Sequence, residues 1–145
     1  MTIRWLPVAL VVLSLTFFLS ATPPAGAQGK PFRIMLSGAA EVPGPGDADG
    51  TGTAELTINP GTGEVCFTIE VENIATPTAA HIHEGTIDTS GGVVVNLDIP
   101  GNGLSGCVSA DREVLVEILK NPDGYYVNVH NADHPAGAVR GQLSH

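Results

Sequence analysis

The stretch that decides the fold is residues 53–72, TAELTINPGTGEVCFTIEVE, in which apolar and polar side chains alternate on both sides of a turn. The alternation runs through residues 53–59 and again through residues 64–72. A period of two is typical of a β-strand with one buried face. The Pro-Gly-Thr-Gly segment at 60–63 supplies turn residues between the two runs. The stretch therefore predicts an antiparallel hairpin.

Further strands and one helix are predicted outside this hairpin. Six segments have the short length and the β-branched or alternating character of strands: 32–38, 79–83, 93–97, 106–110, 125–130 and 138–143. Residues 111–120 predict a helix, because Asp111 can cap it and four apolar side chains fall on one side. Eight short strands and one helix predict an all-β fold, an antiparallel Greek-key β-sandwich or barrel.

Residues 1–27 have the features of a signal peptide. Arg4 precedes an apolar run over residues 6–19, and Ala25-Gly26-Ala27 offers the small residues of a cleavage site. The apolar run is shorter than the roughly 20 residues that a membrane-spanning helix needs. We therefore expect a secreted product, extracellular or periplasmic, that keeps no membrane anchor and forms a single domain over residues 28–145.

The charge of the chain limits its partners. The 145 residues carry a formal net charge of −9 at pH 7. Such an acidic protein is repelled by nucleic acid and by anionic membrane surfaces, so we expect neither as a partner. A cation, or an extracellular or periplasmic protein, fits this charge better.

Cys66 and Cys107 are the only two cysteines of the chain. In an exported protein two cysteines most often pair, and a bridge between them is predicted here. Cys66 is out of phase with its apolar neighbours Val65 and Phe67, which places its thiol on the polar face of the strand. Two free thiols are the alternative, and the oxidising compartment disfavours them.

Histidines at alternating positions are the main functional signal. His81 and His83 point to one face of their predicted strand and Ile82 to the other, and His130 shares a face with Tyr126. If the two strands are neighbours and their apolar residues line one core, three imidazoles meet outside that core. Such a cluster is typical of a Cu or Zn site.

Other residues extend or compete with this interpretation. His134 or Glu84 would supply a fourth ligand or an outer-shell group. The alternative is that each imidazole only hydrogen-bonds loop backbone, a common arrangement for partly buried histidines. Arg140 is the one basic residue near the C-terminus, and we expect it to form a structural ion pair with an acid such as Glu41 or Glu84.

Several ordered motifs together resemble the CHRD domain, the module repeated in chordin and found singly in many exported bacterial proteins. The motifs are Leu36-Ser37-Gly38-Ala39-Ala40-Glu41-Val42-Pro43, Ala80-His81-Ile82-His83-Glu84-Gly85, Gly92-Val93-Val94-Val95-Asn96-Leu97, Tyr126-Val127-Asn128-Val129-His130 and Pro135-Ala136-Gly137-Ala138-Val139-Arg140-Gly141-Gln142-Leu143. The resemblance covers nearly the whole of residues 28–145. It implies a β-sandwich or Greek-key barrel and carries no general biochemical activity.

A second resemblance concerns the histidine strand alone. His81-Ile82-His83-Glu84 is similar to the His-Val-His copper-ligand strand of Cu/Zn superoxide dismutase, although the chain lacks a clear metal-bridging histidine in a zinc loop. Three hypotheses follow: an exported binding or structural module that holds Cu or Zn, a metal-dependent redox enzyme of the dismutase type, and a metal-free interaction module. The chain shows no nucleophile motif of another enzyme class, which favours a module over an enzyme.

Overall fold

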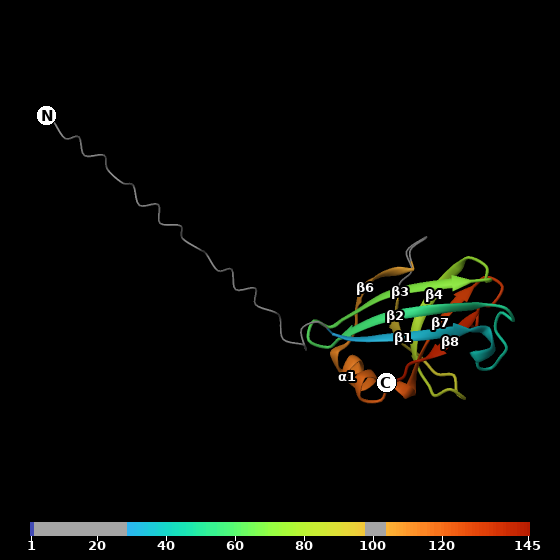
Figure 1. The fold of residues 1–145 in the computed structure, drawn as a ribbon. Helices are drawn as coiled ribbons and strands as arrows, with labels where there is room; N and C mark the ends of the chain where they lie inside the picture. Colours follow the sequence, from blue (N-terminus) through green and yellow to red (C-terminus); the bar gives the residue numbers. More distant parts are fainter. Residues whose placement is uncertain (2–28, 98–103) are drawn as a thin grey trace.

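The structure is a computed structural model that describes residue 1, residues 29–97 and residues 104–145 (Figure 1). The predicted signal peptide, apart from Met1, lies outside the described residues. The elements, in chain order, are β1 (Lys30–Ser37), η2 (Gly38–Ala40), β2 (Thr51–Asn59), β3 (Glu64–Glu72), β4 (Pro77–Glu84), β5 (Val93–Asn96), β6 (Ser105–Ser109), α1 (Arg112–Lys120), η3 (Pro122–Gly124), β7 (Tyr125–Asn131) and β8 (Val139–Gln142).

The eight strands form one antiparallel sheet in the order β5-β4-β7-β8-β1-β2-β3-β6. The sheet curls into a nearly closed barrel, with α1 packed at one end (Figure 1). The predicted hairpin is β2 and β3, in which Leu56 pairs with Phe67 and Ile58 with Val65. The all-β prediction with one short helix is confirmed, and a barrel-like sheet describes the architecture better than a sandwich.

The core lies inside the curved sheet, because alternate residues of the strands point inward. Ile82 of β4 and Val127 and Val129 of β7 are fully buried there. Leu115 and Ile118 of α1 belong to the same apolar cluster. Burial of one stripe of α1 against the strands explains why a helix of this length is stable. The described residues contain no helix with the length and hydropathy to cross a bilayer.

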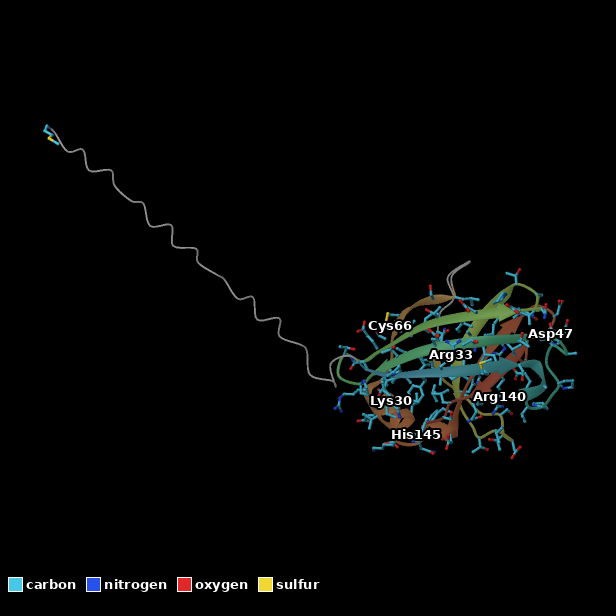
Figure 2. All side chains as sticks on the ribbon, viewed as in Figure 1. Lys30, Arg33, Asp47, Cys66, Arg140 and His145 are labelled. Atoms are coloured by element: carbon cyan, nitrogen blue, oxygen red, sulfur yellow. A yellow bond between two sulfur atoms is a disulfide. The ribbon has the colours of Figure 1, made fainter. Side chains whose placement is uncertain are left out.

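A disulfide ties the edge strand β6 to β3. Cys66 and Cys107 face each other in the strand register and are bonded, with a sequence separation of 41. Cys66 is half-buried and Cys107 is exposed, on the polar side of the sheet as the alternation predicts. Cys66 lies toward the end of the molecule opposite Asp47 (Figure 2). The bond therefore braces the sheet far from the loop that contains Asp47.

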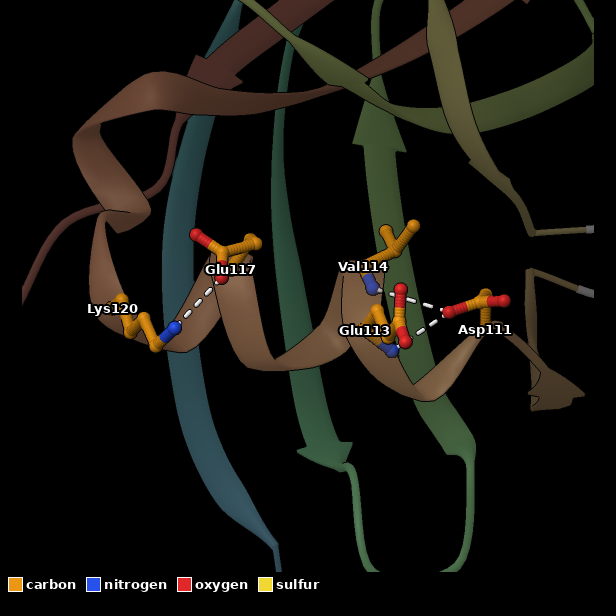
Figure 3. Close-up of polar contacts among 5 residues, drawn as sticks. All are labelled: Asp111, Glu113, Val114, Glu117 and Lys120. Carbon is orange, nitrogen blue, oxygen red and sulfur yellow. Dashed lines mark hydrogen bonds and ion pairs between the residues drawn. The ribbon is translucent and has the colours of Figure 1, made fainter.

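The N-terminus of α1 is capped by a side chain, which gives a test of the local structure. Asp111 Oδ1 accepts hydrogen bonds from the backbone N–H groups of Glu113 (2.7 Å) and Val114 (3.4 Å) (Figure 3). We expect Asp111→Ala to lower the free energy of unfolding by about 1 kcal/mol, because two backbone donors lose their acceptor.

The measurement is urea unfolding beside the control Glu117→Ala, which removes only the exposed pair with Lys120 (2.7 Å). That control is expected to change the free energy of unfolding by less than about 0.5 kcal/mol. Equal losses in the two variants would show that the cap does not stabilise α1.

Candidate metal centre

The candidate site lies on the outer face of the sheet, where β4 and β7 are hydrogen-bonded neighbours. In their register His81 pairs with Asn128 and His83 with Tyr126, while His130 pairs with Ala79. Because Ile82 and the valines of β7 fill the core, the alternating histidines point away from it. The strand adjacency that the metal hypothesis requires is therefore present.

The three imidazoles are close enough to share one ion. His81, His83 and His130 each offer one ring nitrogen, and these three atoms all lie within 4.8 Å of one another. His81 Nδ1 is 3.0 Å from His130 Nε2. The ring centroids of His81 and His83 are 5.5 Å apart. A single ion between the rings can therefore be reached by all three side chains with small adjustments.

Backbone carbonyls fix which nitrogen of two rings is available. His83 Nδ1 is 2.9 Å from the carbonyl oxygen of Gly91, and His130 Nδ1 is 3.1 Å from that of Pro135. A carbonyl oxygen only accepts, so each Nδ1 donates its hydrogen and each Nε2 keeps a lone pair. Carbonyl partners of this kind orient the histidine ligands of metal sites.

His83 Nε2 is a buried nitrogen that lacks a hydrogen-bond partner at this site. The side chain is 8% exposed, and this nitrogen is buried without a hydrogen-bond partner among the described residues. Buried polar atoms are almost always paired, so an unpaired one needs an explanation. A metal ion provides one if it accepts lone pairs from His83 Nε2 and His130 Nε2, and from His81 Nδ1 once its hydrogen bond to His130 Nε2 is replaced. A donor set of neutral imidazoles suits Cu and Zn.

The protonation of the cluster is compatible with metal binding. Burial, together with the neighbouring His130 and His83, lowers the pKa of His81 to about 4. Burial also lowers the pKa of His130, an effect that the Pro135 carbonyl opposes and His83 reinforces. These rings are therefore neutral near pH 7, and the neutral imidazole is the form that coordinates metals.

The structure does not bring the other two candidate ligands into this group. His134 Nε2 lies 3.6 Å from a carboxylate oxygen of Asp47, which ties together the two loops that contain them. Glu84 is exposed at the end of β4. The metal-ligand group found in the part of the chain that the structure describes comprises the three clustered histidines alone.

Arg140, which we expected to form a structural ion pair, has direct side-chain contacts with backbone carbonyls. None of the ion pairs found among the described residues involves Arg140 or Glu84. The guanidinium, only 1% exposed, donates from Nη2 to the carbonyl oxygens of Thr86 (2.7 Å) and Thr89 (3.0 Å). Burial lowers its pKa, an effect that Tyr126 and the charge of Glu41 oppose. Arg140 therefore holds the loop after β4 instead of pairing with an acid.

Glu41 is a buried acid beside this network. Gly137 lies so close to its carboxyl group that a Cβ there would clash with both oxygens. Burial raises the pKa of Glu41 from 4.5 to about 7, although Arg140 and Asn128 act in the opposite direction. A carboxyl group with this pKa titrates near neutral pH.

Glu41 should therefore make stability depend on pH. Its carboxyl pKa is higher in the folded chain than in the unfolded one, so the folded state binds more protons between pH 4.5 and about 7. The free energy of unfolding then falls as pH rises through that window, by at most about 3 kcal/mol. We expect Glu41→Gln to abolish this fall and to be the more stable protein at pH 8.

The test is urea unfolding of both proteins at pH 5 and pH 8. The matched control is Glu70→Gln, since Glu70 is exposed on β3. A difference between wild type and Glu41→Gln that is the same at both pH values would contradict the prediction.

The sequence places Tyr126 on the face of the histidines but does not indicate that it supports His83. The ring of Tyr126 stacks on that of His83, with centroids 4.9 Å apart and planes 10° from parallel. Because Tyr126 alternates with Asn128 and His130, the sequence places it on the same face of the strand as His130. Backbone carbonyls such as that of Gly91 carry no such signal, because any residue has one.

Comparison with known proteins gives one match. The model of the CHRD domain matches residues 32–143, which is most of the chain. None of the curated proteins matches the chain, and none of the solved structures does. The matched range includes all three clustered histidines, Arg140 and Tyr126.

Proposed function

Because the chain belongs to the CHRD domain family, whose membership suggests an extracellular binding or structural module, we propose that it is an exported module that binds one Cu or Zn ion. The ligands are His81, His83 and His130. The bound ion would join β4 to β7 on the outer face of the barrel. Export is supported by the signal-like segment at 1–27 and by the disulfide, which is consistent with an oxidising compartment.

The buried, unpartnered His83 Nε2 carries the proposal. His83 belongs to a group of three histidines that each offer a ring nitrogen within 4.8 Å of the others, and carbonyl oxygens accept from the Nδ1 atoms of His83 and His130. A purely structural histidine of this kind would place both nitrogens against donors or acceptors, since an unsatisfied buried polar atom costs about 1–3 kcal/mol. The acidic net charge of −9 also favours accumulation of cations around the protein.

Calorimetric titration of the untagged protein with Cu(II) and with Zn(II) tests the proposal. We expect one ion per chain in each case, with Cu(II) binding more tightly, as it generally does at nitrogen sites. A control titration with Mg²⁺, which prefers oxygen ligands, is expected to show no binding at this site. Absence of stoichiometric binding of both Cu(II) and Zn(II) would overturn the proposal and leave a metal-free interaction module.

The dismutase-type enzyme remains the alternative from a different class. It requires a redox-active ion with an open coordination position. A superoxide assay of the copper-loaded protein against the zinc-loaded protein separates the two classes. Equal rates in both, no higher than that of the metal-free protein, would exclude the enzyme and leave the binding module.

A further inference from the structure

The loop over residues 85–92 is held against the candidate metal centre by Tyr126. The backbone N–H of Gly91 donates to Tyr126 Oη at 3.3 Å, and the carbonyl oxygen of Gly91 accepts from His83 Nδ1 at 2.9 Å. One glycine is thus bound on one side by the tyrosine hydroxyl and on the other by the imidazole. Movement of Gly91 would change the hydrogen bond that orients His83.

The tyrosine ring also supports His83 directly. The two rings are stacked, with centroids 4.9 Å apart, and Tyr126 is 3% exposed. The guanidinium of Arg140 lies over the Tyr126 ring, with Cζ 3.4 Å from the centroid. β4 and β8 flank β7 on opposite sides, so His83 and Arg140 approach Tyr126 from opposite sides. Cation–π attraction and stacking together restrict the tyrosine ring.

Arg140 anchors the same loop nearer its start. Its Nη2 donates to the carbonyl oxygens of Thr86 and Thr89, at 2.7 and 3.0 Å. The loop is therefore fixed at three residues by two side chains that also stack on each other. This arrangement leaves the Gly91 carbonyl little freedom to leave the His83 ring.

We propose that Tyr126 is a positioning residue for the metal centre, which keeps His83 in the Nδ1–H tautomer with Nε2 directed toward His81 and His130. The role in metal binding rests on the proposed function, whereas the effect on the tautomer of His83 does not. The hydroxyl acts through Gly91, and the ring acts by stacking. An outer-shell group of this kind typically changes metal affinity by roughly 10- to 100-fold.

The experiment compares Tyr126→Phe with Tyr125→Phe in the full protein. Tyr126→Phe keeps the stacked ring and removes the hydroxyl that binds Gly91. Tyr125 is the matched control, because it directly precedes Tyr126 in β7 and packs against the core on the other face. The first readout is the dissociation constant for Cu(II), measured by chelator competition. The second is the tautomer of His83 in the metal-free protein, measured by long-range ¹H–¹⁵N correlation spectra.

We expect Tyr126→Phe to bind Cu(II) about 10-fold more weakly than the wild type and to show a mixture of His83 tautomers. Tyr125→Phe should resemble the wild type in both readouts. Arg140→Lys, which keeps the charge and loses the planar stack, is the second variant and should change both readouts in the same direction as Tyr126→Phe.

The outcomes separate the positioning role of Tyr126 from the proposed metal binding. If Tyr126→Phe matches Tyr125→Phe in the tautomer of His83, or matches it in copper affinity although the wild type binds copper, the positioning role is overturned and the tyrosine is only structural. If the tautomer changes in Tyr126→Phe but the wild type binds no copper, the proposed function fails while the control of His83 by Tyr126 stands. A change in both readouts supports both proposals.

Discussion

Replacing His83 by alanine is expected to remove tight Cu(II) binding. Two nitrogens from His81 and His130 would remain, and a two-ligand site holds an ion far less firmly than a three-ligand site. The increase in the dissociation constant should exceed the roughly 10- to 100-fold that loss of an outer-shell partner causes. His83 is the ligand to remove, because its Nε2 has no other partner among the described residues.

The measurement is chelator competition with Cu(II), beside His134→Ala as the matched control. His134 is also a histidine of the neighbouring loops, but its partner is Asp47 at 3.6 Å. We expect His134→Ala to bind Cu(II) as the wild type does. Equal loss of affinity in both variants, or no loss in His83→Ala, would contradict the three-histidine site.

Removing the disulfide is expected to have the largest effect on stability. Cys66→Ser with Cys107→Ser opens a bridge between residues 41 apart in sequence. The chain-entropy model assigns about 4 kcal/mol to a loop of this length, and losses of native disulfides typically fall at about 2–5 kcal/mol. Because neither cysteine belongs to the apolar core, the substitution should leave no cavity, and the loss reports the cross-link itself.

Urea unfolding of the double variant and of the wild type measures this loss, and wild type reduced with dithiothreitol should match the double variant. Copper binding is the internal control and should not change, since the disulfide joins β3 to β6, whereas the histidines lie on β4 and β7, which are hydrogen-bonded to neither of those strands. A free energy of unfolding within about 1 kcal/mol of the oxidised wild type would contradict the expected contribution of the bond.

The strands were predictable because their period is local. In residues 64–72 each side chain's position in the alternation decides whether it faces the core or solvent, and the observed strand β3 covers the same residues. The helix was predictable for a similar reason, since Asp111 and the apolar stripe lie within ten residues of sequence. The boundaries of other strands shifted by one or two residues, where hydrogen bonding to a neighbour decides the end.

The sequence predicts on which face of its strand each histidine lies, but it does not predict that the three histidines cluster. Alternation places His81 and His83 on one side of β4, whereas the pairing of β4 with β7 joins strands separated by β5, β6 and α1. No local sequence pattern predicts which strands pair. The contacts of Arg140 could not be predicted either. Its partners are backbone carbonyls of a loop, and the sequence does not show where backbone carbonyls lie. It does show charged residues, which is why an ion pair was expected.

The location of the ion is the most direct test of the account. Crystals of the zinc-loaded protein, measured on either side of the zinc absorption edge, would show the ion by its anomalous scattering. We expect one zinc ion per chain, about 2.0–2.1 Å from a ring nitrogen of each of His81, His83 and His130. Zinc found only elsewhere, for example between His134 and Asp47, would contradict it.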